Sequence, residues 1–380
     1  MSITRHGEIR LAIDARTATG AFTGIGRYAT ALVEGLVAQA PDLSLLLIVT
    51  EAAAPQFAAL AGPRVELHAT AYDIPRHPQS DLWMHLVLPR LLRARRIPVL
   101  LSCANYLPVF SGGARRVVTI HDLVPFRHPE LDPWRFVVYL RAMLRQAAFS
   151  ADRVVSVSEA TARELVSILG VPPERIAVIH NGVSRHFRKL APADVHLPAG
   201  VPEAPYVLGV GARIPRKNFV RLVRAHAQLV ARGLPHHLVI AGPPGQSQPD
   251  IEAAIAQAGT SARVHVVGYP SDAELTSLYN RAALFVYPSV YEGFGIPVLE
   301  AMACGAPVVC SSSSSLPEVA GDAAVLCDPL SEGALADACH RVLTDPALEA
   351  TLRAAGPPRA ALFSWDEAAR RTAALVRELA

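Results

Sequence analysis

The sequence predicts an α/β protein of two doubly wound domains, and three observations support this class. Apolar strand-like segments alternate with helical stretches in both halves of the chain, as in parallel sheets covered by helices. The alternation stops between Ser184 and Pro205, where four prolines interrupt it. The chain has 380 residues, more than a single compact core normally uses.

The N-terminal half opens on a strand at Ile9–Ala15, where apolar and polar residues alternate. A loop containing Gly20, Gly24 and Gly26 is expected next, and apolar residues at helical spacing from Ile25 to Leu36 then predict a helix. The later strands of this half are expected at Leu45–Thr50, Val99–Ser102, Val117–His121, Val154–Val157 and Ile176–Ile179.

The C-terminal half repeats the pattern, which predicts a second domain at residues 206–360 after a first domain at 1–185 and a linker at 186–205. Residues 361–380 contain an amphipathic helix, Trp365–Leu379, that could cross back to the first domain, and Ser311–Ser315 is interpreted as a flexible loop rather than a site. The strands of this half are expected at Tyr206–Gly211, His237–Ala241, Val264–Gly268, Ala283–Tyr287 and Pro307–Cys310.

Composition excludes several classes of protein. With 51% apolar and 18% charged residues, the chain is not a disordered one. It shows no apolar run of membrane-spanning length and no secretory signal, and its five cysteines form no CxxC pair, so we expect reduced thiols in a cytoplasmic protein.

Residues 1–190 carry a net charge of +7 and residues 191–380 one of −4. The net charge of +3 gives no indication of nucleic acid binding, while the basic half fits phosphate groups, a membrane surface, or simply arginine-rich composition.

One candidate phosphate site lies in the segment Gly209–Asn218. A strand ends there, and Asn218 is expected to cap a helix that runs to Ala231. The free N–H groups of a helix start attract anions, and Arg213 and Lys217 add two cations. Lys217 is one of only two lysines, against 34 arginines, which suggests a specific need for lysine. The alternative is a solvated basic loop.

A second candidate is the segment Tyr291–Gly305. Pro297 and Gly305 suit the two ends of a short helix at about 297–303. Glu292 lies in the glycine-rich approach to this helix and Glu300 lies one turn into it, so the two carboxylates could hold hydroxyl pairs of a sugar and a ribose. For Glu300 the alternative is a favourable charge near a helix N-terminus.

Two further segments lie at strand ends. His121, at the end of a buried strand, could donate a hydrogen bond or move a proton, although a structural hydrogen bond is the alternative. Gly24 and Gly26 would allow a ligand close to the backbone. No HExxH motif is present, which argues against zinc, and no GxGxxG motif with a following acidic residue is present, which argues against a nicotinamide enzyme.

Together these segments resemble the retaining glycosyltransferases of family four, which have the GT-B fold: two Rossmann-like domains that face each other across a cleft. Glu292 and Glu300 lie in the segment PSVYEGFGIPVLEAMACGAPVV, which resembles the family's E-x7-E motif. The family's phosphate-gripping segment is similar to GVGARIPRKNF. TGIGRY and TIHDLVPF are most similar to bacterial mannosyl- and rhamnosyltransferases of O-antigen and exopolysaccharide assembly.

The resemblance implies a role for each candidate residue. Arg213 and Lys217 would hold the donor diphosphate, and Glu300 the ribose. Glu292 would contact the donor sugar, as would His121 from the other domain. The remaining contacts implied are backbone amides near Phe294, Gly295 and Ile296, Gly24 beside the diphosphate, and Tyr269 beside the base.

The resemblance also implies the reactants. It predicts a nucleotide-diphosphate sugar donor, with GDP-linked mannose or rhamnose as first choice, no cofactor and no metal. The acceptor would be a saccharide or a polyprenyl-diphosphate-linked saccharide. Peripheral contact with the cytoplasmic face of the inner membrane could use Arg90, Arg93, Arg95 and Arg96 with Trp83, Leu86, Leu88 and Leu91, or these residues could simply form a packed helix with a charged face. A sugar-nucleotide epimerase and a non-catalytic two-lobed binding protein are the alternatives.

Overall fold

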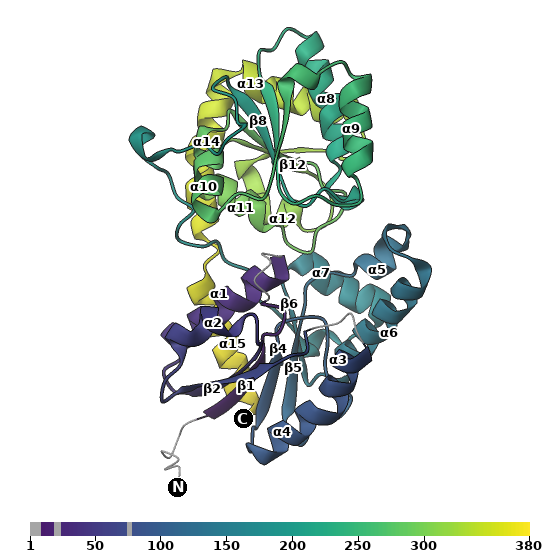
Figure 1. Ribbon diagram of the computed structural model, residues 1–380, viewed down its shortest axis with the longest axis vertical. Coiled ribbons are helices and arrows are strands. Elements are labelled where there is room, and N and C mark those ends of the chain that lie inside the picture. The colour runs from purple at the N-terminus through teal and green to yellow at the C-terminus, as the bar shows by residue number, and fades with distance from the viewer. Residues whose placement is uncertain (1–8, 19–23, 74–77) are drawn as a thin grey trace. The chain divides into compact units, whose positions relative to one another are not determined.

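A computed structural model describes residues 9–18, 24–73 and 78–380. The chain divides into two compact units: the first holds the chain up to Gly182 together with Ser364–Ala380, and the second is Val183–Phe363. Each unit contains one parallel sheet with helices on both faces (Figure 1), so the predicted class of two doubly wound domains is confirmed. In the described part of the chain, no helix is both long and apolar enough to cross a membrane.

The sheet of the first unit has the strand order β3-β2-β1-β4-β5-β6-β7, with all neighbours parallel. The chain order reverses between β1 and β4, which is where ligands of doubly wound sheets bind. The predicted strands are all present, and β3 was not predicted. The strands are β1 (Ile9–Asp14), β2 (Leu43–Thr50), β3 (Val65–Thr70), β4 (Val99–Ser102), β5 (Arg115–Ile120), β6 (Arg153–Ser156) and β7 (Ile176–Val178).

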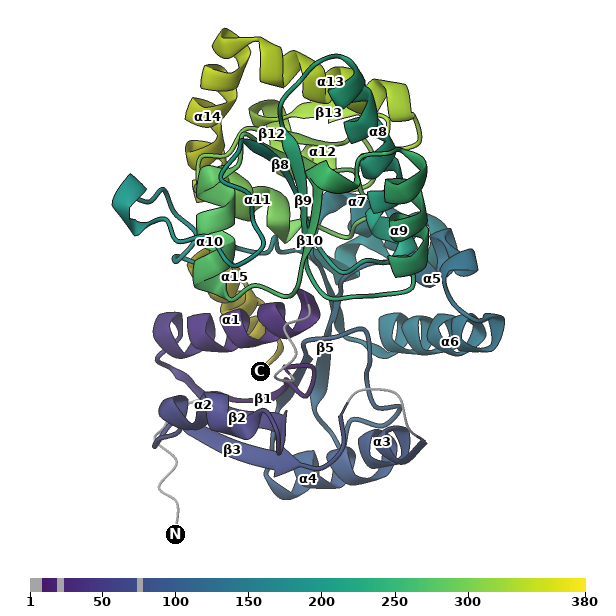
Figure 2. The same ribbon diagram turned by 45° about the horizontal axis from the view of Figure 1, so that its top comes forward.

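Helices cover both faces of this sheet (Figures 1 and 2). Gly24 and Gly26 lie in the first turn of α1, so their prediction as loop residues was wrong, while Gly20 lies outside the described residues. Two π-helical segments occur at Trp83–Val87 and Leu165–Leu169. The helices are α1 (Gly24–Gln39), α2 (Ala54–Phe57), α3 (Pro78–Leu82), α4 (Leu88–Ala94), α5 (Val124–Arg127), α6 (Trp134–Ser150), α7 (Glu159–Glu164) and α15 (Trp365–Leu379).

The residues expected at a membrane contact are only partly on the surface. Trp83 and Leu88 are 7% and 0% exposed, so their assignment to such a contact was wrong, and Leu91 is partly buried in the same core. Trp83 lies beneath the guanidinium of Arg16 instead.

Helix α15 packs on α1, although more than 300 residues separate them in the sequence. Trp365 contacts Tyr28 edge-to-face at 5.7 Å between ring centroids. Gly35 allows this close approach, because a Cβ there would lie only 2.9 Å from Ala369 Cβ. At the other end of the helix, Arg377 forms two hydrogen bonds with the carboxylate of Asp42 at 2.7 and 2.8 Å. The C-terminal helix is thus part of the first unit.

The sheet of the second unit has the order β10-β9-β8-β11-β12-β13, again all parallel. Its predicted strands are present, and the three-residue β13 was not predicted. The strands are β8 (Tyr206–Val210), β9 (His237–Ala241), β10 (Val264–Val267), β11 (Leu284–Tyr287), β12 (Val308–Ser311) and β13 (Val325–Cys327).

In the second unit, α8, α9 and α13 form one apolar core with the sheet, and α10, α11 and α12 lie on its other side (Figures 1 and 2). All five cysteines of the chain are free and buried, as predicted for reduced thiols. The helices are α8 (Phe219–Ala231), α9 (Gln248–Gln257), α10 (Asp272–Arg281), α11 (Ile296–Ala303), α12 (Leu316–Ala320), α13 (Glu332–Thr344) and α14 (Pro346–Ala361).

The proline-rich stretch before β8 contains no strand and belongs to the second unit. Its backbone is fixed to α10: Leu190 N–H donates to Asn280 Oδ1 at 2.8 Å, and His196 N–H donates to Ser277 Oγ at 3.1 Å. Phe187 is buried against the ring of Tyr279. Residues 186–205 therefore pack on the second unit through side chains as well as backbone.

Candidate active site

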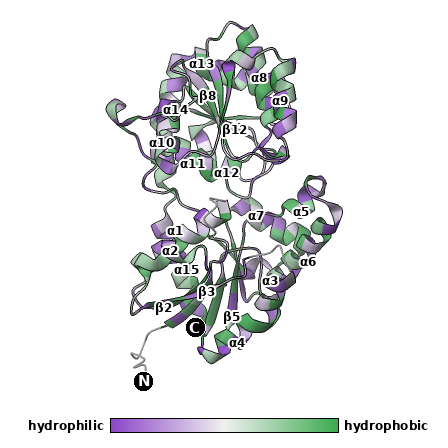
Figure 3. Ribbon diagram, in the orientation of Figure 1, coloured by the Kyte–Doolittle hydropathy of each residue, from purple (hydrophilic) through white to green (hydrophobic). Residues whose placement is uncertain are grey.

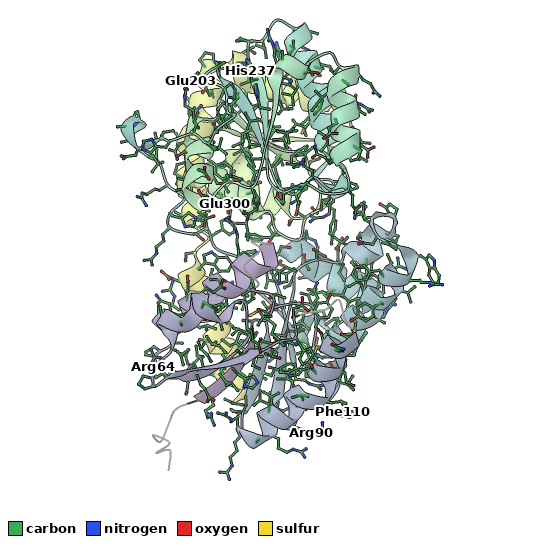
Figure 4. All side chains as sticks on the ribbon, in the orientation of Figure 1. Arg64, Arg90, Phe110, Glu203, His237 and Glu300 are labelled. Atoms are coloured by element: carbon green, nitrogen blue, oxygen red, sulfur yellow. The ribbon has the colours of Figure 1, made fainter. Side chains whose placement is uncertain are left out.

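The candidate residues of the second unit gather at the carboxyl ends of its strands. Figure 4 shows Glu300 and His237 at opposite ends of this unit. Because His237 begins β9, Glu300 lies toward the carboxyl ends of the parallel strands. Ligands of open α/β sheets bind at these ends.

Glu292 is the centre of a buried ionic cluster. Its Oε1 lies 2.7 Å from Lys217 Nζ, and its Oε2 lies 2.6 Å from Arg216 Nη1. The hydroxyl of Tyr287, at the end of β11, donates to Oε1 at 3.1 Å and also contacts Lys217 Nζ. The sequence analysis selected Lys217 and Glu292 but missed Arg216 and Tyr287.

The two cations determine the charge state of Glu292. Burial alone raises the pKa of this carboxyl, but the charges of Arg216 and Lys217 and the hydrogen bond from Lys217 more than offset burial and lower the pKa to about 2. Burial and the adjacent carboxylate raise the pKa of Tyr287 well above its usual value. Glu292 is therefore ionised at neutral pH and accepts hydrogen bonds, and Tyr287 keeps its hydrogen.

A short 3₁₀ turn, Pro215–Lys217, brings Arg216 and Lys217 to the same carboxylate. Asn218 follows in the left-handed conformation, with φ +61°, and ends this turn. Asn218 stands at the N-cap of α8, but the expectation that its side chain caps the helix was wrong. Instead Nδ2 donates to the carbonyls of Pro288 at 2.9 Å and Pro329 at 2.7 Å, so the side chain fixes the turn to two other loops.

Arg213 lies in the same loop but makes different contacts. Its Nη1 donates to the carbonyl of Gly242 at 2.6 Å and lies 3.4 Å from that of Val267, at the carboxyl ends of β9 and β10. Burial lowers the pKa of this guanidinium. Its Nε is buried and has no hydrogen-bond partner in the described part of the chain. Arg213 thus links the carboxyl ends of two strands, and its Nε–H is a buried donor that forms no hydrogen bond with the described residues.

Gly295 shapes the start of α11, the helix predicted at 297–303. Its φ of +109° is strained for any other residue, and a Cβ there would lie 2.5 Å from Leu316 Cδ2. Before it, Phe294 is buried against Phe363. One turn into the helix, the buried carboxylate of Glu300 accepts a hydrogen bond from Tyr279 at 2.9 Å. The first N–H groups of such a helix have no partner within it and can meet an anion.

The serine run after β12 holds this glycine loop in place. Ser314 Oγ accepts a hydrogen bond from the N–H of Glu292 at 2.9 Å. The buried Ser315 Oγ lies 2.9 Å from the carbonyl oxygen of Glu292 and 2.8 Å from that of Phe294. Ser313 Oγ donates to the carbonyl of Val290 at 2.8 Å. The interpretation of Ser311–Ser315 as a flexible loop was wrong, because its hydroxyls fix the backbone on both sides of Glu292.

His121 belongs to the first unit and follows β5 directly. Its Nε2 lies 2.8 Å from the carbonyl oxygen of Cys103, and its ring contacts Tyr28 edge-to-face. Because a carbonyl only accepts, Nε2 carries the hydrogen and Nδ1 is the acceptor of the neutral ring. Burial lowers the pKa of His121, which keeps the ring neutral near pH 7.

The other candidates are placed as follows. Gly24, also in the first unit, is exposed, and a Cβ there would meet no atom within 4 Å. Tyr269 follows β10 and is 46% exposed. An ion pair brings Lys217 and Glu292 together, whereas Arg213 and Glu300 form hydrogen bonds with other groups at the same end of the sheet. No cluster of three metal-ligating side chains occurs among the described residues.

Comparison with known proteins identifies the family. Residues 22–187 match the model of Glycosyltransferase Family 4, and residues 199–358 match that of Glycosyl transferases group 1. The O-antigen chain mannosyltransferase B of Escherichia coli is 31% identical over 372 residues, which cover 92% of this chain and 94% of that protein. The chain belongs to the group 1/family 4 glycosyltransferases. This membership favours the predicted glycosyltransferase over its two alternatives, the sugar-nucleotide epimerase and the non-catalytic binding protein.

Other similar proteins are consistent with membership of this glycosyltransferase family. The serotype-specific mannosyltransferase WbdA of Escherichia coli is 29% identical over 275 residues, covering 69% of this chain and 33% of that protein. Among solved structures, sucrose-phosphate synthase from Thermosynechococcus elongatus has a TM-score of 0.77 at 23% identity, covering 98% and 99% of the two chains. WaaG, a glycosyltransferase involved in lipopolysaccharide biosynthesis, has a TM-score of 0.75 at 16% identity, covering 97% and 99%. These likenesses confirm the predicted GT-B fold.

Proposed function

We propose that this glycosyltransferase moves mannose, or a deoxyhexose such as rhamnose, from a nucleoside-diphosphate sugar to a saccharide or a polyprenyl-diphosphate-linked saccharide. The observation that carries the proposal is the buried cluster of Arg216, Lys217 and Glu292 beside the start of α11. Mannose is the first choice because two relatives are named mannosyltransferases. Guanosine diphosphate is the proposed carrier of the sugar.

The proposed role of the basic loop is to stabilise the leaving diphosphate. Lys217 and Arg213 contact its oxygens, Arg216 supports Lys217 from the other side of Glu292, and the first N–H groups of α11 face the same charge. Donors that are already in place stabilise a developing anion by about 3 kcal/mol each. The donor C1–O bond to the diphosphate breaks, the C1–O bond to the acceptor forms, and the acceptor proton passes to the departing phosphate oxygen.

The carboxylates would position the donor. Glu292, ionised and fixed by Arg216, accepts hydrogen bonds from the sugar hydroxyls, and Glu300 accepts them from the ribose. His121 Nδ1 accepts from a sugar hydroxyl on the side of the first unit. Neither Glu292, with a pKa of about 2, nor His121, whose pKa burial lowers, is suited as a general base. This supports transfer with retention, in which no side chain has to activate the acceptor.

The proposal includes a reaction without a metal ion. Lys217, Arg213 and the helix start already supply positive charge at the phosphate, and a divalent cation among them would be repelled. The carboxylate best placed to bind a cation, Glu292, is already paired with two side chains. The protein groups alone would therefore carry the leaving-group charge.

A panel of nucleotide sugars tests this function. We expect GDP-mannose to raise the melting temperature most and to support transfer to a mannose-terminated saccharide, with an α-linked product by NMR. Glu300→Gln should weaken binding of the nucleotide diphosphate, whereas Glu292→Gln should spare this binding and slow transfer. A different preferred sugar would change the substrate only, whereas a β-linked product from an α-linked donor would reject retention. The same pattern of defects in both variants would reject the division between ribose and sugar.

A further inference from the structure

Two aromatic rings lie in series behind His121, the histidine assigned to the donor sugar. The His121 ring meets Tyr28 edge-to-face, with 4.7 Å between ring centroids and 86° between ring planes. Tyr28 in turn meets Trp365 edge-to-face at 5.7 Å and 68°. The three residues come from the end of β5, from α1 and from α15, and all belong to the first unit. The start of the C-terminal helix is therefore connected to His121 through one side chain.

Tyr28, the middle ring, is fixed at both ends. It is buried, and its hydroxyl lies 3.0 Å from Thr119 Oγ1. Thr119 lies on β5 two residues before His121, which places both side chains on one face of this strand end. Tyr28 thus packs against two positions of the same strand end, and its ring cannot move away from His121 without losing the contact with Thr119.

Trp365 is also held tightly in place. It is the first residue of α15, and Ser364 caps this helix, because Ser364 Oγ accepts a hydrogen bond from Glu367 N–H at 3.1 Å. Gly182 passes so close that a Cβ there would lie 2.2 Å from Trp365 N and 2.8 Å from Trp365 Cγ. The backbone at residue 182 therefore leaves the tryptophan little room to shift.

The packing of α15 on α1 does not depend on the Trp365 ring alone. The buried face of this helix otherwise consists of small or aliphatic residues, and Trp365 is its only aromatic residue. Hydrophobic and hydrophilic residues both occur along α15, as in an amphipathic helix (Figure 3). At the far end, Arg377 binds Asp42 through two hydrogen bonds. The contact of Trp365 with Tyr28 is thus one attachment among several, and it is the one that leads to His121.

Hydrogen bonds hold His121 from another direction but leave its ring one freedom. Its N–H donates to Asn105 Oδ1 at 2.9 Å, and its Nε2 donates to the Cys103 carbonyl at 2.8 Å. A ring held by a single hydrogen bond can still tilt about that bond. The edge-to-face contact with Tyr28 removes this freedom and fixes the direction of Nδ1. Direction matters because a misplacement of about 1 Å that originates far from the reacting atoms can cost about 100-fold in rate.

We propose that Trp365, acting through Tyr28, is a positioning residue for His121, so that the C-terminal helix sets the direction in which His121 meets the donor sugar. This inference rests on the proposed function, because it requires that His121 contacts that sugar. The alternative is a structural role alone, in which Trp365 only stabilises the packing of α15 on α1. The two roles differ in what they predict for the turnover of folded protein.

Transfer kinetics of the full chain test the proposal. Trp365→Leu keeps an apolar contact but removes the flat ring, and we expect its turnover number to fall about tenfold with an unchanged KM for the nucleotide sugar. Trp365→Phe restores a ring at this position and should recover the turnover number to within about twofold of wild type. Tyr28→Leu removes the middle ring while the tryptophan stays, and should lose turnover as Trp365→Leu does.

The matched control is Arg377→Gln, which breaks the attachment of α15 at its other end. This variant should lower the melting temperature and keep the wild-type turnover number, measured at a temperature where every variant is folded. Equal losses of turnover in Trp365→Leu and Arg377→Gln would show that α15 acts through stability alone, and would overturn the proposal.

NMR of isotope-labelled histidine reports on the His121 ring without any reaction, and His121→Ala assigns its signals. Burial lowers the pKa of His121, so a ring that loosens toward water in Trp365→Leu should show a pKa that rises toward its usual 6.5. Asp122, whose charge favours the protonated ring, is present in every variant and cannot cause this difference. Trp365→Phe and Arg377→Gln should keep the wild-type titration.

The kinetics of His121→Ala separate this inference from the proposed function. If His121→Ala transfers sugar at the wild-type rate, the proposed role of His121 is wrong and the inference fails with it. If His121→Ala is slow while Trp365→Leu keeps the wild-type turnover number or the wild-type His121 titration, the inference alone is overturned. Slow transfer in both variants, with recovery in Trp365→Phe, supports it.

Discussion

Lys217 Nζ lies 2.7 Å from Glu292 Oε1, and the two side chains are only 12% and 9% exposed. The cation assigned to the donor diphosphate is thus paired with the carboxylate assigned to the donor sugar. A diphosphate that binds Lys217 competes with Glu292 for it, and Arg216 continues to compensate the carboxylate. The cluster can therefore give up one ion pair without leaving a buried charge alone.

Replacing Lys217 by alanine should lower transfer about 100-fold, because a preorganised cation is lost where leaving-group charge develops. The melting temperature should change little, since Arg216 still neutralises Glu292. Lys189→Ala is the matched control, because Lys189 is the other lysine and is exposed. Transfer assays and thermal unfolding measure both effects. Near-normal turnover in both Lys217→Ala and Arg213→Ala would contradict the assignment of the phosphate site to this loop.

The low pKa of Glu292 makes stability depend on acid pH. Its pKa is about 2 in the folded protein, against 4.5 for a free carboxyl. The ionised form therefore adds stability that is fully present above about pH 4.5 and is lost as the pH falls toward 2, on the order of 3 kcal/mol. In denaturant unfolding, the Glu292→Gln variant should not show this loss of unfolding free energy between pH 4.5 and 2. The variant Glu203→Gln, at an exposed glutamate, should still show it. Parallel curves for wild type and Glu292→Gln would contradict the ion pairing.

His121→Ala should slow sugar transfer by about 10- to 100-fold and leave nucleotide diphosphate affinity unchanged, because His121 belongs to the unit that lacks the Lys217 loop. Because burial lowers the pKa of His121 below its usual 6.5, any inflection of the wild-type rate that comes from this ring should lie below pH 6.5. Calorimetry with the diphosphate and a pH series of transfer rates measure these properties. Equal losses of affinity and rate would place His121 in another role.

Ser315→Ala should destabilise the second unit by about 1–3 kcal/mol, because it removes the buried hydroxyl whose single hydrogen is shared between the carbonyls of Glu292 and Phe294. The turnover number should fall more than the affinity for the nucleotide diphosphate, since the loop around Glu292 loses its support while Glu300 keeps its own. Ser312→Ala, at an exposed serine of the same run, is the control. An unchanged turnover number in a folded Ser315→Ala protein would show that the loop holds its position without this hydroxyl.

Transfer should survive excess EDTA, because the proposed phosphate contacts are all protein groups. Adding Mg²⁺ or Mn²⁺ should give no more than a small change in rate. The assay compares EDTA-treated protein with and without each ion. Loss of activity in EDTA with rescue by one ion would reject the metal-independent mechanism and make Glu292 and Glu300 candidate ligands.

The alternation of strands and helices was enough to predict most of the fold. Strand β3 was missed because its sequence, VELHAT, places charged and polar residues on an edge strand that is only partly buried. Strand β13 is three residues long, which is too short for periodicity to detect. Strand order is set by packing between segments far apart in sequence, so no local pattern could supply it.

The site was predictable where a residue type is unusual and not where the role depends on a distant partner. A rare lysine identified Lys217, but its neighbour Arg216 looked like any of the 34 arginines until the 3₁₀ turn brought both to Glu292. The serine run looked like a polar loop, because its function lies in carbonyl groups about twenty residues away. A polar run beside a buried strand end is the one signal that could have indicated it.

The packing of α15 on α1 also sets an order of events on the ribosome. Domains generally fold as they emerge during synthesis. The second unit is continuous in sequence and can complete its fold as soon as Phe363 has left the exit tunnel. The first unit begins earlier but finishes later, because the groove beside Tyr28 and Gly35 stays open until Trp365 and Ala369 arrive. The unit whose translation begins first is thus the last to complete its fold.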